Sequence, residues 1–344
     1  MRVKVENIRT ISESILMHKG VPSEHAKIIA DTIVYAHVRE KHTHGLGRMS
    51  IYLRKIDDQL MDAKTAMNVL HDQGAVYHVD ANHGFGQVAA YYAVMKAVKK
   101  AKEYGIGIAG VMNSNNFGTA GYFSKLASDH GMIGLVFGNS APAIAPTGGS
   151  KSLFGTNPLS MAFPMKDAQR PFIFDMATSV AARGKIRLAA KNGESIPEGW
   201  ALDSEGHPTT DPNEALKGSM IPIGEYKGVG LSMMVDVLAG MLTGAAFAGD
   251  VKGLNHKTDF SRYGHLVMVI DPEKFMSIDE YYERVEYFEN KVHEYSGTIP
   301  GENSNDNAMK NADYVTIPDK QFAEINALAE TYGLADRLVE EANV

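Results

Sequence analysis

Hydrophobic residues recur every three to four positions through the first part of the chain. This spacing occurs in residues 8–20, 23–34 and 49–60, and each run predicts an amphipathic helix. Gly20 can end the first helix, because glycine readily adopts the backbone conformation found just after helix ends. The chain is therefore expected to begin with a helical part.

Short apolar runs alternate with further helical patterns after residue 75. We expect strands over 75–80, 106–113, 132–139, 171–179 and 264–272, and helices over 86–105 and 119–131. This alternation indicates an α/β sheet with helices on its faces. Residues 140–164, rich in glycine and proline, predict loops or short strands, and long connections of this kind often carry function. Residues 226–244 predict a largely buried apolar helix, and the end of the chain is predicted to be helical and charged.

Composition narrows the class of protein. The 344 residues are 44% hydrophobic and 22% charged, with a net charge of −7 and no block of lysine or arginine, which argues against a nucleic-acid surface. The absence of cysteine excludes disulfides, thiolate catalysis and cysteine zinc sites. Charges spread through the first twenty residues and the lack of a long apolar run predict no signal peptide and no membrane span. We expect a cytoplasmic protein.

The stretch "GFGQVA" (84–89) fits the dinucleotide-binding pattern G-x-G-x-x-A between a predicted strand and a predicted helix. An acidic residue is expected about twenty positions later, at the end of the next strand, to bind a ribose. Glu103 instead falls inside the predicted helix. A plain glycine turn is therefore the favoured interpretation of this stretch.

The stretch "KHTHGLGRMSIY" (41–52) has three interpretations. His42 and His44 could hold a metal if they lay on a strand, but no third ligand is evident and we expect no metal. His44 could transfer a proton near neutral pH, and on a helix Arg48 would lie on the same face and bind a carboxylate. The third interpretation is a polar helix start without chemistry.

Three further junctions carry polar residues that could face a ligand. "NSNNFGTAGY" (113–122) follows a strand and opens a helix, and "DMATS" (175–179) does the same with Asp175 at its start. "GTNP" (155–158) is a turn by composition, and the hydroxyl of Thr156 could point to a ligand. Each is also consistent with a structural turn.

Taken together, these motifs resemble one family, the malate/L-lactate dehydrogenases of the second type. The family includes ureidoglycolate, sulfolactate and diketogulonate dehydrogenases and a cyclic imino-acid reductase. The matching stretches are "HTHGLGRM", "GFGQ", "NSNNFGTAGY", "APTGG", "FGTNPLSMAFP", "FDMATS", "GWALDSEGHPTTDP", "YKGVGLSMMVDVLAG" and "IPGE". They run in order from about residue 8 to residue 330, and within the family the chain looks most similar to the ureidoglycolate dehydrogenase branch.

The resemblance implies a fold that the spacing did not give. These enzymes bind NAD or NADP on a mixed sheet without a Rossmann fold, so "GFGQVA" is not expected to bind pyrophosphate. Residues 1–72 together with about 275–344 would form a flanking helical part for substrate binding and dimerisation, and residues 73–274 the α/β nucleotide-binding part. The family also implies a homodimer with the active site near the junction of the subunits.

The resemblance also assigns roles to residues. His44 looks like the acid/base, Thr43 stands where the family usually has a serine that orients this histidine, and Arg48 looks like the clamp for the substrate carboxylate. Thr156 matches a substrate-side position. The positions that match cofactor contacts are Ser140, Asp175, Met176, Ala177, Lys227, Gly228, Pro300, Gly301 and Glu302.

The chain departs from the family at Asn116, where relatives commonly carry a histidine that has been assigned proton transfer in the ureidoglycolate branch. An asparagine cannot transfer a proton at neutral pH. Either His44 then carries the proton alone, or the substrate differs, or activity is lost. A second departure is "VREKHTHG" before the histidine pair.

With the histidine and arginine as base and carboxylate clamp, the resemblance implies an NAD(P)-dependent 2-hydroxy acid dehydrogenase that acts on a small carboxylate such as malate, lactate or ureidoglycolate. NAD is the expected cofactor, with NADP possible. The alternatives are a reductase of the C=N bond of a cyclic imino acid, and a cofactor-binding protein without turnover. Neither a nucleic acid nor a membrane is an expected partner.

Overall fold

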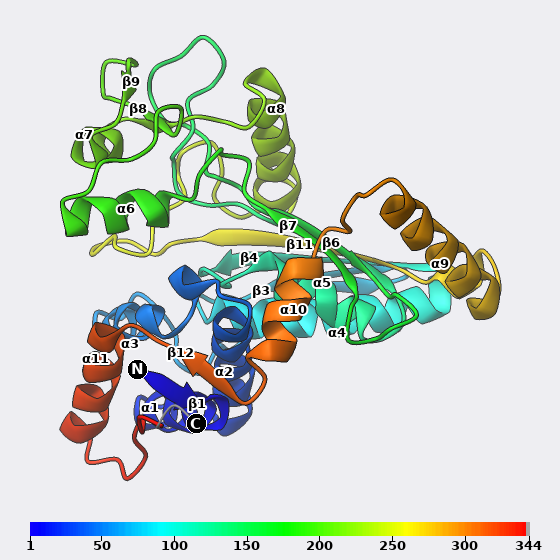
Figure 1. The fold of residues 1–344 in the computed structure, drawn as a ribbon, viewed down its shortest axis with the longest axis horizontal. Helices are drawn as coiled ribbons and strands as arrows, with labels where there is room; N and C mark the ends of the chain where they lie inside the picture. The colour runs from blue at the N-terminus through cyan, green and yellow to red at the C-terminus, as the bar shows by residue number, and fades with distance from the viewer. Residues whose placement is uncertain (342–344) are drawn as a thin grey trace.

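A seven-stranded mixed sheet forms the centre of the structure, a computed structural model that describes residues 1–341 (Figure 1). The strands are arranged in the order β2 (Asn68–Gln73), β3 (Val76–Asp80), β4 (Ile106–Ser114), β11 (Tyr263–Ile270), β5 (Ile133–Gly138), β6 (Leu159–Phe163) and β7 (Phe172–Met176). Only the β3–β4 pair is parallel, and the other neighbours are antiparallel. This topology differs from the doubly wound parallel sheet of a Rossmann domain, as predicted.

Helices cover both faces of this sheet. On one face α4 (Gly86–Tyr104) and α5 (Ala120–Ser128) bury alanine, valine and phenylalanine side chains against β4, β5 and β11. On the other face α8 (Tyr226–Val235) continues into a π-helical turn (Asp236–Met241). Val235 of α8 and Ala239 of the turn pack on Phe137 and Leu266. Apolar residues on both faces of its central strands fix the sheet between the helices.

The two ends of the chain meet in a helical part. It contains α1 (Val5–His18), α2 (Ser23–Val38), α3 (Met49–Asp57) and α11 (Asp319–Thr331), together with the strands β1 (Arg2–Lys4) and β12 (Tyr314–Thr316). β1 pairs with β12 in antiparallel fashion, so the first residues are joined to a segment more than 300 positions away. One apolar cluster links these elements. Residues 342–344, the end of the predicted C-terminal part, lie outside the described residues.

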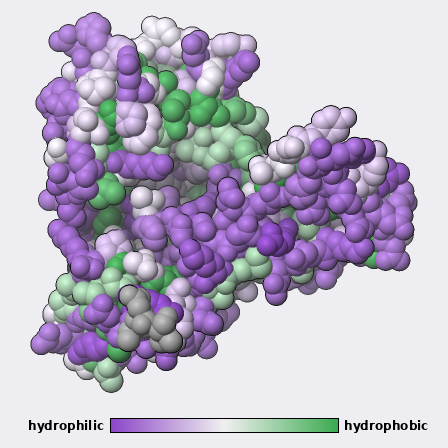
Figure 2. Space-filling view, viewed as in Figure 1, coloured by the Kyte–Doolittle hydropathy of each residue, from purple (hydrophilic) through white to green (hydrophobic). Residues whose placement is uncertain are grey.

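A further lobe holds α6 (Arg183–Asn192), α7 (Pro212–Lys217) and a small sheet of β8 (Ala201–Leu202), β9 (Pro208–Thr209) and β10 (Ser219–Met220). In Figure 1 this lobe lies across from the helical part, and Figure 2 shows the surface hollowed between the two. The remaining helices, α9 (Ile278–Glu294) and α10 (Glu302–Lys310), lie beside β6 and β7.

Most of the predicted elements are confirmed within a few residues. The interpretation of residues 226–244 was wrong in one respect, because this helix is not largely buried. Met233, Met234, Val237, Met241 and Leu242 are 40–65% exposed, whereas the opposite side of the helix is buried on the sheet. Composition alone does not distinguish a helix buried in its own chain from one that presents an apolar face outward.

Among residues 1–341, no helix combines the length and the apolar character that a membrane crossing requires.

Candidate active site

Two short 3₁₀ turns that lead into α3 carry the predicted residues Thr43, His44 and Arg48. The first turn, η1, comprises His42–His44, the second, η2, comprises Leu46–Arg48, and Gly45 separates them with an extended backbone. Residues 44 to 48 therefore do not form one α-helix, and the predicted reason for placing Arg48 beside His44 was wrong. Their proximity has a different origin, a hydrogen bond back to the turn: Arg48 Nε donates to the carbonyl oxygen of Thr43 at 2.7 Å.

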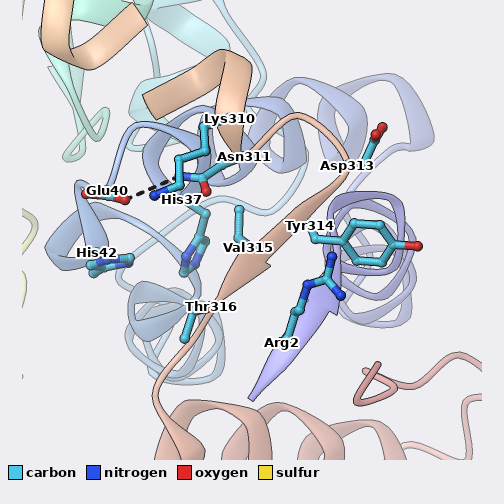
Figure 3. Close-up of a pocket in the computed structure, with 10 residues that line it drawn as sticks. All are labelled: Arg2, His37, Glu40, His42, Lys310, Asn311, Asp313, Tyr314, Val315 and Thr316. Atoms are coloured by element: carbon cyan, nitrogen blue, oxygen red, sulfur yellow. Dashed lines mark hydrogen bonds between the residues drawn. The ribbon is translucent and has the colours of Figure 1, made fainter. Parts of the chain in front are cut away.

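A buried histidine, which lines the cavity shown in Figure 3, is hydrogen-bonded to the backbone of these turns. His37, at the end of α2, is 1% exposed, and its Nε2 accepts a hydrogen bond from the backbone N–H of Leu46 at 2.9 Å. A Cβ atom at Gly45 would lie 2.3 Å from the same nitrogen, so only glycine allows the turn to approach the ring. The close approach of Gly45 to His37 thus determines the position of the turn that carries His44.

His44 is half-buried and has the environment of a neutral base. Its Nδ1 lies 3.0 Å from the hydroxyl of Thr43, which can fix the orientation of the ring as predicted for the family's serine. Burial and the positive charge of Arg48 lower the pKa of His44 to about 4, and Asp175 opposes this effect. At neutral pH the imidazole is therefore uncharged and able to accept a proton.

Arg48 presents its guanidinium next to this base. Its Nε is held by Thr43, and no partner for its two terminal nitrogens is found among residues 1–341. Two parallel N–H groups match the two oxygens of a carboxylate. The geometry is that of an anion clamp adjacent to a proton acceptor.

A second arginine faces this clamp from the opposite lobe. In α6, Gly184 contacts Thr43, since a Cβ there would lie 3.4 Å from Thr43 Cγ2, and Arg187 is one helical turn further along the same face. Partial burial and the charge of Arg48 lower the pKa of Arg187, although its side chain remains largely accessible to solvent. Burial raises the pKa of Tyr263, at the start of β11, to about 12, and the charges of both arginines oppose this rise. Two cations therefore lie close together at the site.

An ion pair joins the turn to the end of β7. Lys41 Nζ lies 2.7 Å from Asp175 Oδ2, and the two side chains are 29% and 12% exposed. Asp175 is a predicted cofactor residue, and Met176 and Ala177 follow it as half-buried residues. The departure "VREKHTHG" thus places a lysine directly on a predicted cofactor carboxylate.

The loop 139–157 adds polar groups to the same region. Asn157 Oδ1 accepts from the backbone N–H of Ser140 at 2.9 Å, and the carbonyl oxygen of Thr156 accepts from both the N–H and the hydroxyl of Thr178. The hydroxyl of Ser140 is buried and has no partner among residues 1–341. A buried hydroxyl without a partner is expected where a ligand completes the hydrogen bonding, so the residues fit a bound cofactor here.

Two distant segments meet β7 and the residues after it. The carbonyl oxygen of Pro300 accepts from Ile173 N at 3.0 Å, and Gly301 adopts a positive φ of 103° against the backbone of Ile173. Glu302 pairs with His293 at 2.5 Å.

The other segment precedes α8, where Ile223 N donates to the carbonyl oxygen of Thr178. Gly228 is buried against the carbonyl oxygen of Ile223, whereas Lys227 is exposed. The predicted cofactor positions therefore lie along β7 and beside the residues that follow it, but the Lys227 side chain faces solvent.

Asn116 and the "GFGQVA" stretch are packed against each other. Asn116 Oδ1 accepts from Gly118 N at 3.2 Å and so shapes the loop between β4 and α5. A Cβ at Gly86 would lie 2.1 Å from the carbonyl oxygen of Asn115, and one at Gly84 would lie 2.5 Å from Thr65. Protein atoms occupy the space that a pyrophosphate would need, so these glycines serve backbone packing.

The histidine pair does not form part of a metal-binding group in residues 1–341. His42 instead approaches the ring of His37, with centroids 5.8 Å apart. One group of three possible ligands, Glu289, His293 and Glu302, has ligand atoms within 4.8 Å of one another. These side chains are partly or fully exposed, and such groups are common on protein surfaces without an ion.

Sequence reasoning missed His37, Lys41 and Arg187. His37 lies in an amphipathic helix where a histidine has no distinguishing pattern, and Arg187 follows the "DMATS" junction by several residues in an ordinary charged helix. For Lys41 the departure from the family was visible in the sequence, but its partner was not.

Comparison with known proteins finds the same family that the sequence motifs resemble. The family model for malate/L-lactate dehydrogenase matches residues 3–326. A malate/(S)-sulfolactate dehydrogenase of Methanothermus fervidus is 39% identical over 329 residues, which is 94% of this chain and 96% of that protein. A Δ(1)-pyrroline-2-carboxylate reductase of Pseudomonas fluorescens is 32% identical over 275 residues, 80% of this chain and 82% of that protein.

The fold is also found among solved structures. Sulfolactate dehydrogenase from Methanocaldococcus jannaschii superposes with a TM-score of 0.90 at 35% sequence identity, and the match covers 97% of this chain and 98% of that one.

Proposed function

Because the chain belongs to the malate/L-lactate dehydrogenase family, we propose that the site at η1 and η2 carries out the reaction of this family. The protein is a nicotinamide-dependent oxidoreductase that acts on a small 2-hydroxy or 2-oxo carboxylate. When bound, the cofactor accepts or supplies the hydride that is exchanged with C2 of the substrate. The chain's own residues bind and orient the substrate and transfer the proton.

We assign the proton to His44. In the oxidation direction its neutral Nε2 takes the proton of the substrate hydroxyl, while Nδ1 is held at the hydroxyl of Thr43. The observation that carries this assignment is geometric: a half-buried histidine, whose Nδ1 lies at the hydroxyl of Thr43, stands beside an arginine whose terminal nitrogens have no partner among residues 1–341. Asn116 helps to shape the neighbouring loop and moves no proton.

We assign substrate binding to the two arginines. Arg48 binds the carboxylate next to C2, and Arg187 faces it across the site and binds a second acidic group. A substrate with two anionic groups would neutralise both cations, whereas lactate would leave one unpaired. The proposed substrate class is therefore a dianionic 2-hydroxy acid of the malate or sulfolactate type. Thr156 completes the substrate side of the site in this proposal.

The cofactor residues remain as predicted from the family. Ser140, Asp175, Met176, Ala177, Lys227, Gly228, Pro300, Gly301 and Glu302 would hold it. The buried hydroxyl of Ser140 without a partner supports this placement. NAD is the proposed cofactor, with NADP as the alternative. A relative named as an NADP(+)-dependent sulfolactate dehydrogenase supports keeping both.

The proposal extends to assembly and location. We propose a cytoplasmic homodimer, with the helical part built from residues 1–72 and about 275–344 flanking the α/β part of residues 73–274. The exposed apolar side chains of α8 and the π-helical turn gather on one face in Figure 2 and support association with a second copy. Replacing Met241 and Leu242 by aspartate should yield a monomer in analytical ultracentrifugation.

A cyclic imino-acid reductase is the second candidate, supported by the similarity to the pyrroline-2-carboxylate reductase. The discriminating experiment follows the absorbance of reduced nicotinamide. Purified protein receives NADH or NADPH with oxaloacetate, sulfopyruvate, pyruvate or a cyclic imine. Consumption with the two dianions supports the proposal, consumption with the imine alone selects the reductase, and cofactor binding without turnover of any compound would identify a binding protein.

A further inference from the structure

One buried carboxylate lies beside both ends of the loop 139–157, which carries the cofactor residue Ser140 and the substrate residue Thr156 of the proposed site. Asp236 is 5% exposed and is the first residue of the π-helical turn that follows α8. It pairs with no cation among residues 1–341. A buried carboxylate without a cation is costly unless hydrogen bonds satisfy it, so the groups that surround it define its role.

Two asparagines that flank the loop in sequence surround this carboxylate. Asn139 precedes Ser140, Asn157 follows Thr156, and both are at most 1% exposed. Asp236 Oδ1 lies 3.5 Å from Asn139 Nδ2. Burial raises the pKa of Asp236, and hydrogen bonds from the amides of both asparagines oppose this rise. A single side chain therefore contacts the residues at both ends of the loop.

Each asparagine in turn fixes the backbone next to a residue of the proposed site. Asn157 Oδ1 accepts from Ser140 N at 2.9 Å, and its Nδ2 donates to the carbonyl oxygen of Ser232 in α8 at 2.8 Å. Asn139 Oδ1 accepts from Gly264 N in β11 at 2.9 Å. The two amides thus connect the ends of the loop to α8 and to the central sheet.

Glycines allow these segments to approach each other closely. A Cβ at Gly155 would lie 2.3 Å from both the carbonyl oxygen and the hydroxyl of Ser140, and one at Gly240, in the π-helical turn, would lie 2.7 Å from Asn139 Nδ2. Ser232 Oγ donates to the carbonyl oxygen of Gly155 at 2.8 Å. The buried Ser140 hydroxyl, without a partner among the described residues, is therefore held in place by the backbone around it. Short π-helical turns of this kind are frequent at functional sites.

The groups around Asp236 are donors, and a carboxylate is the side chain that accepts from all of them. Its Oδ2 accepts from Ala248 N at 2.7 Å, while Oδ1 faces the amide of Asn139. An asparagine at position 236 would have the same shape but would turn an NH₂ group toward one of these donors. That donor would then be buried without an acceptor, and the segment that carries it would have to shift.

We propose that Asp236 is a positioning residue, which sets Ser140 and Thr156 relative to each other and so aligns the cofactor side of the site with the substrate side. It acts through the amides of Asn139 and Asn157. The roles of Ser140 and Thr156 rest on the proposed function, whereas the anchoring of the loop does not.

Fluorescence titration of NADH and NADPH against the purified full-length protein tests the effect on the cofactor side. We expect Asp236→Asn to weaken binding of the preferred cofactor about fivefold or more. Asp250→Asn, at an exposed position of the following segment, is the matched control and should bind as wild type. Melting curves give a temperature at which both variants are folded. Equal binding by Asp236→Asn and wild type overturns the proposal.

A double-mutant cycle separates positioning from a general structural defect. Ser140→Ala should weaken cofactor binding in wild type but have little further effect in Asp236→Asn, because both changes remove the same contact. Fully additive losses overturn the proposal. In turnover the KM for the substrate should also rise in Asp236→Asn, because Thr156 moves, whereas a loss of folded protein alone would lower kcat and leave KM unchanged.

Hydrogen exchange without cofactor tests the anchoring of the loop by itself. The amides of residues 139–157 should exchange faster in Asp236→Asn than in wild type and Asp250→Asn, while those of α4 should not change. Unchanged exchange of residues 139–157 overturns the proposal. A wild-type protein that binds neither nucleotide would refute the proposed function, and the exchange rates would still decide whether Asp236 anchors the loop.

Discussion

Lys41 and Asp175 form an ion pair of 2.7 Å that joins the catalytic turn to the end of β7. The two residues are 134 positions apart and come from the helical part and the edge of the central sheet. The pair thereby fixes the predicted proton acceptor relative to the predicted cofactor residues. It also contributes to the electrostatics, since Lys41 is one of the cations that lower the pKa of His44.

Replacing this lysine should weaken the connection. In Lys41→Ala the partly buried carboxylate of Asp175 loses its cation, and we predict a loss of about 1 kcal/mol in the free energy of unfolding. Urea denaturation measures the change. Lys99→Ala is the control, because that exposed lysine forms no ion pair in residues 1–341. Equal stability of the two variants would show that the pair does not hold the two parts together.

The pH dependence of stability should reflect three shielded histidines. Burial lowers the pKa of His37, His44 and His265 to about 4, whereas the unfolded chain titrates near 6.5. Between these values the unfolded state binds protons that the folded state does not. The free energy of unfolding should therefore fall as the pH falls from 6.5 to 4. Urea denaturation at several pH values measures the slope.

His265→Gln should make this slope shallower, while His130→Gln, at an exposed position, should leave it unchanged. A slope that stays the same in His265→Gln would contradict the assignment.

Substrate choice should depend on Arg187. Its replacement in Arg187→Gln removes the cation proposed for the second acidic group, and we predict that kcat/KM for malate falls about tenfold or more while that for lactate changes little. Lys185→Gln, on the same helix, is the matched control. An equal loss for malate and lactate would place Arg187 outside the second anion site.

The sequence predicts the helices and the central strands well, because their apolar spacing reflects burial within the chain. β2 could not be predicted in this way, since every residue of Asn68–Gln73 is exposed and its pairing with β3 leaves no alternation of burial. The two-residue strands β8, β9 and β10 are too short to show any period. β1 and β12 pair across almost the whole chain, which no local pattern reveals.

Some residues of the candidate site could be predicted from the sequence, and others could not. His44 and Arg48 carry their chemistry in the residue type and in a motif, so sequence reasoning found them. The roles of His37, Lys41 and Arg187 depend on which residues of other elements lie beside them, and only the tertiary structure shows those neighbours. The helix of residues 226–244 has an apolar face of the length expected, but its exposure depends on what covers it.

The most direct test of the account compares His44→Ala with Asn116→Ala. Turnover of the preferred substrate is measured alongside cofactor binding, followed by nicotinamide fluorescence. The account predicts that His44→Ala lowers kcat by about 10²- to 10⁴-fold with cofactor binding intact, and that Asn116→Ala stays within about tenfold of wild type. Normal turnover in His44→Ala, or a collapse confined to Asn116→Ala, would contradict the assignment of the proton to His44.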